Sequence, residues 1–270
     1  MKNMKVHENT IHNDLIDPLI KECNSIHNIT KSLPILDEGK YSTFWLDKDS
    51  NPKTLIEYIV QQISIQDYPN GFPSDYMGME WWIQIKKNKE DIVFHYDKDE
   101  ALCTSKKIYH YPLKSTITYL TDNGGPTAIF NNNEYNDGYL SFPKTNKHVV
   151  FKGDLFHGVI GPLSKKIPNN GTQRVTLLIN YWNKRPMEPN CTLVKYDKYN
   201  LLPLSEEHIK LQSTVQKEKS KIIKMNYKNG SNNVTIYRTN TPILINFSKD
   251  LREHRTYSFK YKKDIVHITL

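Results

Sequence analysis

Apolar residues follow a helical period near the N-terminus and a period of two through the middle of the chain. Between residues 15 and 20, leucine and isoleucine recur at helical spacing, which predicts a short amphipathic helix that ends before Pro34. A second helix is expected over residues 51–63, because an Asn-Pro pair precedes a helical run of apolar residues. From Glu80 onward apolar and polar residues alternate, which is typical of half-buried β-strands.

Short alternating segments separated by turn residues fill residues 80–182. One turn is the Asn-Gly-Gly-Pro run at residues 123–126. Many short strands joined by turns predict an antiparallel sandwich or barrel, so the expected fold is mainly β with flanking helices. We divide the chain into three parts: an N-terminal support region of helices and a strand (1–79), a β core (80–189) and a C-terminal extension (190–270).

The C-terminal extension differs from the core in its pattern. Ser205 and the two glutamates after it form a helix-start signal, and this helix is expected to run toward Met225 through a lysine-rich stretch. Alternating segments beyond residue 232 predict further strands.

Composition narrows the class of protein. A net charge of +8 leaves nucleic acid open as a partner, but the lysines form no arginine-rich stripe, so this partner is not favoured. The three cysteines are widely scattered, which indicates neither a disulfide framework nor a zinc site and favours a reducing cytoplasmic or nuclear compartment. No apolar run has membrane-spanning length and no secretory signal is expected, so neither a membrane nor secretion is predicted.

Candidate metal ligands lie at the end of one predicted strand, residues 91–97. His95 and Asp97 are two positions apart, so a strand places both side chains on the same face. One imidazole and one carboxylate are two thirds of the triad that holds non-heme Fe(II) with open positions. His157 follows a Gly-Asp turn on a later segment and can supply the second imidazole.

A candidate anion site lies on the clearest strand of the chain, residues 174–182. Arg174, Thr176 and Asn180 share one face of this strand, while aliphatic residues and a tyrosine occupy the other. A guanidinium binds a carboxylate through two parallel hydrogen bonds, and a threonine hydroxyl can add a third. An arginine on the polar face of a barrel strand therefore predicts a carboxylate clamp.

With these residues in place, the segment from Trp81 to Trp182 resembles the Fe(II)/2-oxoglutarate-dependent oxygenase superfamily. The resemblance implies a double-stranded β-helix, a cupin-like jelly roll, in which His95, Asp97 and His157 hold Fe(II). The residues around the motif, with Phe94 before His95 and Tyr96 between His95 and Asp97, are similar to those of an uncharacterised branch of that superfamily.

The resemblance also implies a cosubstrate and a reaction. Arg174 and Thr176 would bind the distal carboxylate of 2-oxoglutarate, and O2 would be the oxidant. Such a dioxygenase releases succinate and CO2 while it hydroxylates a C–H bond, and Asp97 indicates a hydroxylase rather than a halogenase. Three more polar positions on neighbouring strands are candidates for contact with the cosubstrate: Gln84, Thr118 and Asn180.

Two other interpretations are compatible with the same residues. With ten histidines in the chain, a His-x-Asp pair can arise by chance, and Arg174 could belong to a buried structural ion pair. The alternative function is a non-catalytic metal- or ligand-binding jelly-roll module. Arg174 discriminates, because a pure binding barrel needs no carboxylate clamp beside the metal. The expected prime substrate is a protein side chain or a small molecule.

Overall fold

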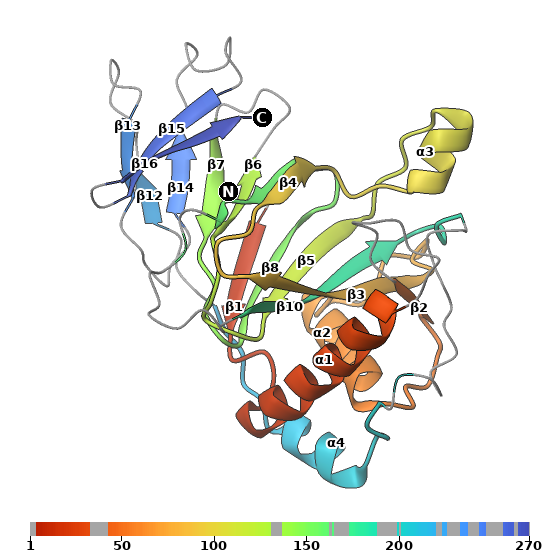
Figure 1. The fold of residues 1–270 in the computed structure, drawn as a ribbon. Helices are drawn as coiled ribbons and strands as arrows, with labels where there is room; N and C mark the ends of the chain where they lie inside the picture. Colours follow the sequence, from red (N-terminus) through yellow and green to blue (C-terminus); the bar gives the residue numbers. More distant parts are fainter. Residues whose placement is uncertain are drawn as a thin grey trace.

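The computed structural model describes residues 4–32, 43–130, 137–161, 164, 173–187, 199, 201–219, 223–225, 233–236, 243–246, 256–261 and 264–269 (Figure 1). Eight strands build the core: β3 (Gly78–Lys87), β4 (Ile92–His95), β5 (Lys114–Tyr119), β6 (Thr127–Phe130), β7 (Asp137–Ser141), β8 (Lys147–Lys152), β9 (His157–Val159) and β10 (Gln173–Trp182).

The core strands form two facing antiparallel sheets. In the larger sheet β8, β5, β10 and β3 are neighbours in that order, and in the smaller one the order is β7, β6, β9 and β4. Most consecutive strands pass from one sheet to the other, which is how a jelly roll is wound. The strand order is that of a double-stranded β-helix, so the fold predicted from the sequence is confirmed.

Further strands lengthen both sheets. β1 (Met4–Glu8) pairs with β8, β2 (Phe44–Asp47) pairs with β3, and β11 (Glu218–Lys219) pairs with β1. β14 (Ile243–Asn246) pairs with β7 and with β12 (Ile223–Met225). A third sheet has the order β13 (Asn233–Ile236), β15 (Thr256–Tyr261), β16 (Asp264–Thr269).

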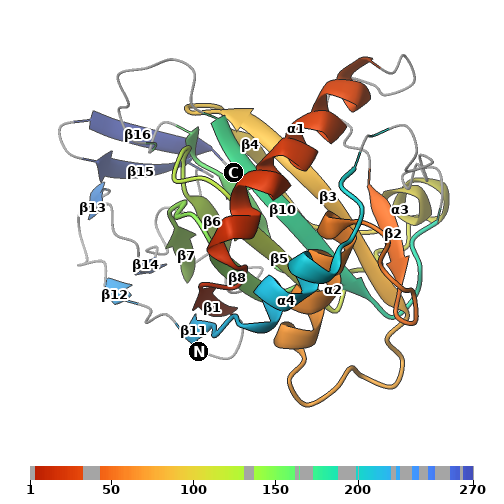
Figure 2. The same cartoon turned by 90° about the horizontal axis from the view of Figure 1, so that it is seen from below.

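Helices cover the outer face of the larger sheet (Figure 2). They are α1 (Ile16–Ser32), preceded by the 3-10 turn η1 (Asn13–Leu15), and α2 (Leu55–Asp67). Thr54 and Glu57 form a capping box that fixes the start of α2. The apolar sides of both helices pack on the outward residues of β3 and β10, among them Trp81 and Leu177, in one buried cluster. This support leaves the opposite face of the sheet for the space between the two sheets.

The extension begins as expected and then departs from the prediction. Ser205 caps α4 (Glu206–Ser213), but the helix ends at Ser213 instead of running toward Met225. Residues 223–225 are strand β12. The predicted long helix was wrong because the chain after Ser213 exchanges helical hydrogen bonds for pairing of β11 with β1. None of the helices in the described part of the chain is both long and apolar enough to cross a bilayer.

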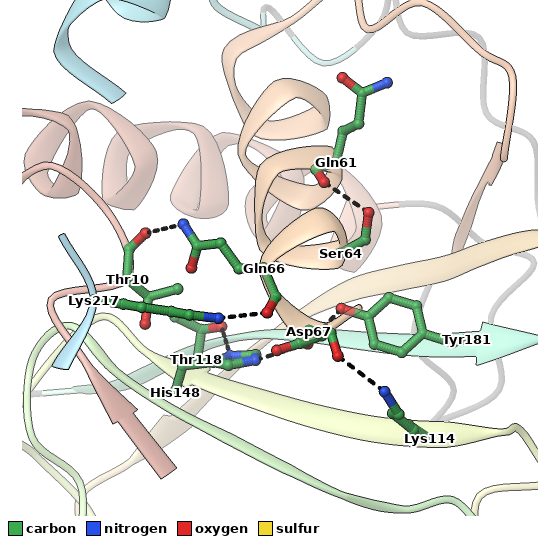
Figure 3. Close-up of polar contacts among 10 residues, drawn as sticks. All are labelled: Thr10, Gln61, Ser64, Gln66, Asp67, Lys114, Thr118, His148, Tyr181 and Lys217. Atoms are coloured by element: carbon green, nitrogen blue, oxygen red, sulfur yellow. Dashed lines mark hydrogen bonds and ion pairs between the residues drawn. The ribbon is translucent and has the colours of Figure 1, made fainter. Parts of the chain in front are cut away.

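A buried polar cluster joins the end of α2 to the larger sheet (Figure 3). The Asp67 carboxylate accepts hydrogen bonds from Tyr181 at 2.7 Å and from Nε2 of His148 at 3.1 Å. His148 Nδ1 lies 2.8 Å from the Thr118 hydroxyl. The Lys114 ammonium donates to the Asp67 backbone carbonyl at 3.0 Å. Burial favours the neutral form of Asp67, but the neighbouring His148 outweighs it and holds the pKa below the ordinary value.

A second buried carboxyl, Glu22, lies on α1 and accepts a hydrogen bond from the Leu202 amide at 2.7 Å. It is 2% exposed, and burial raises its pKa from 4.5 to about 7. A raised pKa in the folded state means stability that is present below pH 4.5 and is lost as the pH rises through 7.

The Glu22→Gln variant should therefore be more stable than the wild type at pH 8 and should lose this advantage toward pH 4.5. The pKa shift of Glu22 corresponds to a difference in the free energy of unfolding of at most about 3 kcal/mol. Urea unfolding at both pH values measures it. The exposed Asp17→Asn on the same helix should leave the pH dependence unchanged. Parallel pH profiles for wild type and Glu22→Gln would contradict the assignment.

Candidate metal centre and anion site

Three predicted ligands converge between the sheets. One ligand atom each from His95, Asp97 and His157 lies within 4.8 Å of the others, and no other such group occurs in the described part of the chain. Nε2 of His95 is 3.6 Å and Nε2 of His157 is 3.7 Å from Oδ1 of Asp97. β4 and β9 pair antiparallel with His95 opposite His157, so the sheet itself brings the two imidazoles together.

Backbone carbonyls orient both imidazoles. Nδ1 of His95 lies 2.7 Å from the carbonyl of Val93, and Nδ1 of His157 lies 2.9 Å from the carbonyl of Leu155. Each Nδ1 can only donate to a carbonyl, which leaves the lone pair of each neutral ring on Nε2. This is the arrangement in which an outer hydrogen bond fixes the tautomer of a metal-binding histidine. The donor set therefore fits a divalent transition metal.

Two of the three ligands, Asp97 and His157, have pKa shifts that favour the charge states that bind metal. Burial alone would raise the pKa of Asp97, but the two histidines, His157 first, outweigh it and hold that pKa well below its usual range. Burial lowers the pKa of His157, with Asp97 opposing only in part. Burial also acts downward on His95, but the adjacent Asp97 raises its pKa overall. An ionised carboxylate and a neutral imidazole are the forms that bind metal.

The three ligands differ in their exposure to solvent. The side chains of His157 and Asp97 are 7% and 9% exposed, whereas that of His95 is 43% exposed. Val93, two residues before His95 on β4, is 83% exposed. The ligand on β4 is therefore the most exposed of the three.

Arg174 lies in the same interior and is 2% exposed. Its guanidinium donates to Gln84 and Thr176 at 3.3 Å and to Thr127 at 3.1 Å. The ring of Tyr119 lies beneath it, 5.4 Å from the guanidinium carbon. These three hydrogen bonds go to neutral oxygens, and an aromatic ring packs against the cation.

An apolar step, the level of the interior formed by Leu178, Trp82 and Ile117, separates the guanidinium from the metal ligands. After Thr176, Leu178 is the next interior residue along β10, and its register partners are Trp82 and Ile117. After it comes Asn180, 3% exposed, opposite Ser115. The interior thus runs from a cation, through an apolar step, to the metal-ligand group.

The remaining predicted residues divide between the two faces of the larger sheet. Gln84 and Thr176 contact Arg174, and Asn180 faces the same interior. Thr118 does not join them: it lies opposite Leu177 in the register and its hydroxyl bonds His148 on the helix side of the sheet. The expected contact of Thr118 with a cosubstrate is therefore not supported, because a strand places Thr118 and Tyr119 on opposite faces.

Two residues of the anion site were not expected from the sequence. Thr127 comes from the smaller sheet, and the Tyr119 hydroxyl donates to it at 2.9 Å. Gly124 packs against the stem of Arg174: a Cβ atom there would lie 2.6 Å from Cδ. Its φ of +94° also favours glycine. The Asn-Gly-Gly-Pro run was a visible signal for the turn, but nothing local showed which side chain it covers.

Comparison with known proteins finds similar solved structures but no matching family. No family model and no curated protein matches the chain. Similar solved structures include a prolyl-4-hydroxylase from Pseudomonas putida (16% identity, 68% of this chain and 94% of that chain, TM-score 0.46). Another is IDO from Bacillus thuringiensis (16% identity, 68% of this chain and 94% of that chain, TM-score 0.41). A third is HygX from Streptomyces hygroscopicus, solved with nickel and 2-oxoglutarate (10% identity, 67% of this chain and 82% of that chain, TM-score 0.40).

Proposed function

We propose that this protein is an Fe(II)- and 2-oxoglutarate-dependent dioxygenase that hydroxylates a C–H bond of a protein side chain or a small molecule. The observation that carries the proposal is the placement of the His95–Asp97–His157 group and the Arg174 guanidinium in one barrel interior, with an apolar step between them. A five-carbon oxo diacid has the same order of groups: a carboxylate, a short methylene chain and a chelating oxo acid.

Each part of the interior has a role in this reaction. Arg174 would bind the distal carboxylate, with Thr176, Gln84 and Thr127 holding the guanidinium in place. Leu178 and its register partners would contact the methylene chain. His95, Asp97 and His157 would hold Fe(II), which supplies the oxygen-activating redox chemistry when bound. One O2 is consumed: one oxygen atom enters succinate and the other forms the new hydroxyl group.

The test of this function is turnover of the cosubstrate. Incubation with Fe(II), ascorbate, 2-oxoglutarate and air should release succinate and CO2, slowly without prime substrate and faster with it. Mass spectrometry of treated cell extract should then reveal products heavier by one oxygen atom. A protein that binds Fe(II) but gives neither succinate nor an oxo-acid-dependent visible absorption band without oxygen would instead be the binding module.

Arg174→Leu should raise the dissociation constant for 2-oxoglutarate about 100-fold, since truncating one partner of a buried charge pair costs about 2–5 kcal/mol. The affinity for the monocarboxylate 2-oxobutanoate should change little, because that acid lacks the distal carboxylate. Calorimetry with 2-oxoglutarate and with 2-oxobutanoate measures how far the dissociation constant of each acid changes in the variant. Lys152→Ala, a change of a surface lysine 59% exposed, is the control. Equal weakening of both acids would show that Arg174 does not bind the distal carboxylate.

A further inference from the structure

Ser115 occupies an interior position beside the metal-ligand group. On β5 it lies opposite Phe151 of β8 on one side and Asn180 of β10 on the other. The Phe151 ring is 5.0 Å from the His157 ring, which places this row of residues at the level of the metal ligands. Ser115 is also close enough to the Asp97 carboxylate for its hydroxyl to add to the lowering of the Asp97 pKa.

Two polar atoms in this row are buried without a partner. Neither Oγ of Ser115 nor Oδ1 of Asn180 meets full hydrogen-bond geometry with any residue that the structure describes, the nearby Asp97 carboxylate included, and the two residues are 1% and 3% exposed. A buried polar atom without a hydrogen bond costs about 1–3 kcal/mol, so such atoms are uncommon unless they serve a site. Here both lie in the interior row that also contains Phe151, whose ring contacts that of the metal-ligand candidate His157.

We propose that Ser115 and Asn180 form a hydrogen-bond relay that orients the Asp97 carboxylate for metal binding. Oδ1 of Asp97 faces both imidazoles, so the second carboxylate oxygen is the one available to the Ser115 hydroxyl. The Asn180 amide group, one strand further, would donate to Oγ of Ser115 and direct its proton toward Asp97. Ser115 and Asn180 are then positioning residues that act through Asp97. The relay rests on the metal site of the proposed function and does not depend on the oxo acid.

A carboxylate held in this way presents one oxygen to the metal and keeps the other in a hydrogen bond. Partners of this kind fix the orientation of metal-binding side chains, and their loss typically weakens metal affinity about 10- to 100-fold. Ser115→Ala should therefore weaken Fe(II) or Co(II) binding within that range, measured anaerobically without any oxo acid. Ser115→Thr, which keeps the hydroxyl, should restore an affinity near that of the wild type.

Thr116→Val is the matched control. Thr116 is the next residue on β5, is 1% exposed, and its hydroxyl also makes no hydrogen bond to a described residue, but it lies on the opposite face of the strand. Its removal should leave the metal affinity unchanged. The absorption spectrum of the Co(II)-loaded protein gives a second measurement, which should change in Ser115→Ala and stay unchanged in Thr116→Val.

A double-mutant cycle tests the relay itself. If Asn180 acts through Ser115, Asn180→Ala weakens metal binding in the wild type but has no further effect in Ser115→Ala. Wild-type affinity in Ser115→Ala, equal weakening in Thr116→Val, or additive effects of the two relay changes would overturn the proposal while leaving the metal site in place. A wild-type protein that binds no Fe(II) or Co(II) would instead overturn the proposed function, and the relay with it.

Discussion

His157→Ala should abolish stoichiometric Fe(II) binding and lower any 2-oxoglutarate turnover by at least about 10³-fold, because the bound metal supplies several kcal/mol to such a reaction. His157 contributes one of two imidazoles, and Asp97 with a single histidine is a poor site for Fe(II). Metal content after anaerobic dialysis against limiting Fe(II) measures the first effect, and succinate release measures the second. His95→Ala should behave in the same way.

The two variants should differ in stability. The His157 side chain is 7% exposed and that of His95 is 43% exposed, so replacing His95 disturbs the packing less. His95→Ala should therefore remain folded while it loses the metal, which separates metal loss from unfolding. The control His27→Ala changes a half-buried histidine on α1, far from the ligand group in sequence and in fold, and should keep the metal. Stoichiometric iron in both ligand variants would show that the ligand assignment is wrong.

Asp67→Ala should lower the free energy of unfolding by about 3–5 kcal/mol, the cost of removing one partner from a buried charged network. The variant leaves His148 and Tyr181 without the carboxylate that pairs with both behind the larger sheet (Figure 3). Because a typical domain is stable by only about 5–15 kcal/mol, this single change approaches the limit of folding. Urea unfolding at pH 7 gives the value directly.

The same carboxylate predicts a pH dependence. The pKa of Asp67 is lowered in the folded state, so its stabilisation is present above the ordinary value of 3.8 and is lost as the pH falls below it. The wild type should lose this contribution in acid, whereas Asp67→Ala should not. Glu100→Ala, which removes an exposed ion pair with Lys98, should cost at most about 1 kcal/mol. A loss for Asp67→Ala no larger than that for Glu100→Ala would refute the proposed importance of the cluster.

Much of the metal site could be predicted because a strand leaves little choice. Alternation along a strand predicted that His95 and Asp97 point together. The structure brings them together, with Nε2 of His95 3.6 Å from Oδ1 of Asp97, although β4 ends at His95 and Asp97 lies just beyond it. The same rule places Arg174 and Thr176 on one face of their strand and the aliphatic Val175 and Leu177 on the other. The structure has this arrangement. Local signals also marked the ends of several elements, such as the Ser205 cap of α4. Asp99 caps α3 (Glu100–Lys106) in a similar way, a helix that the sequence pattern did not predict.

The sequence by itself determined the ligand types, the faces within each strand and the jelly-roll class. Tertiary structure alone decided how strands align with one another. Alternation along β5 puts Thr118 and Ser115 on opposite faces. The register with β10, which sets Thr118 opposite Leu177 and Ser115 opposite Asn180, decides which of these faces is the interior. One therefore joins His148 and Asp67 on the helix side, and the other lies beside the metal ligands. The period along a strand is a local property of the backbone, whereas the register between strands depends on contacts between residues far apart in the chain.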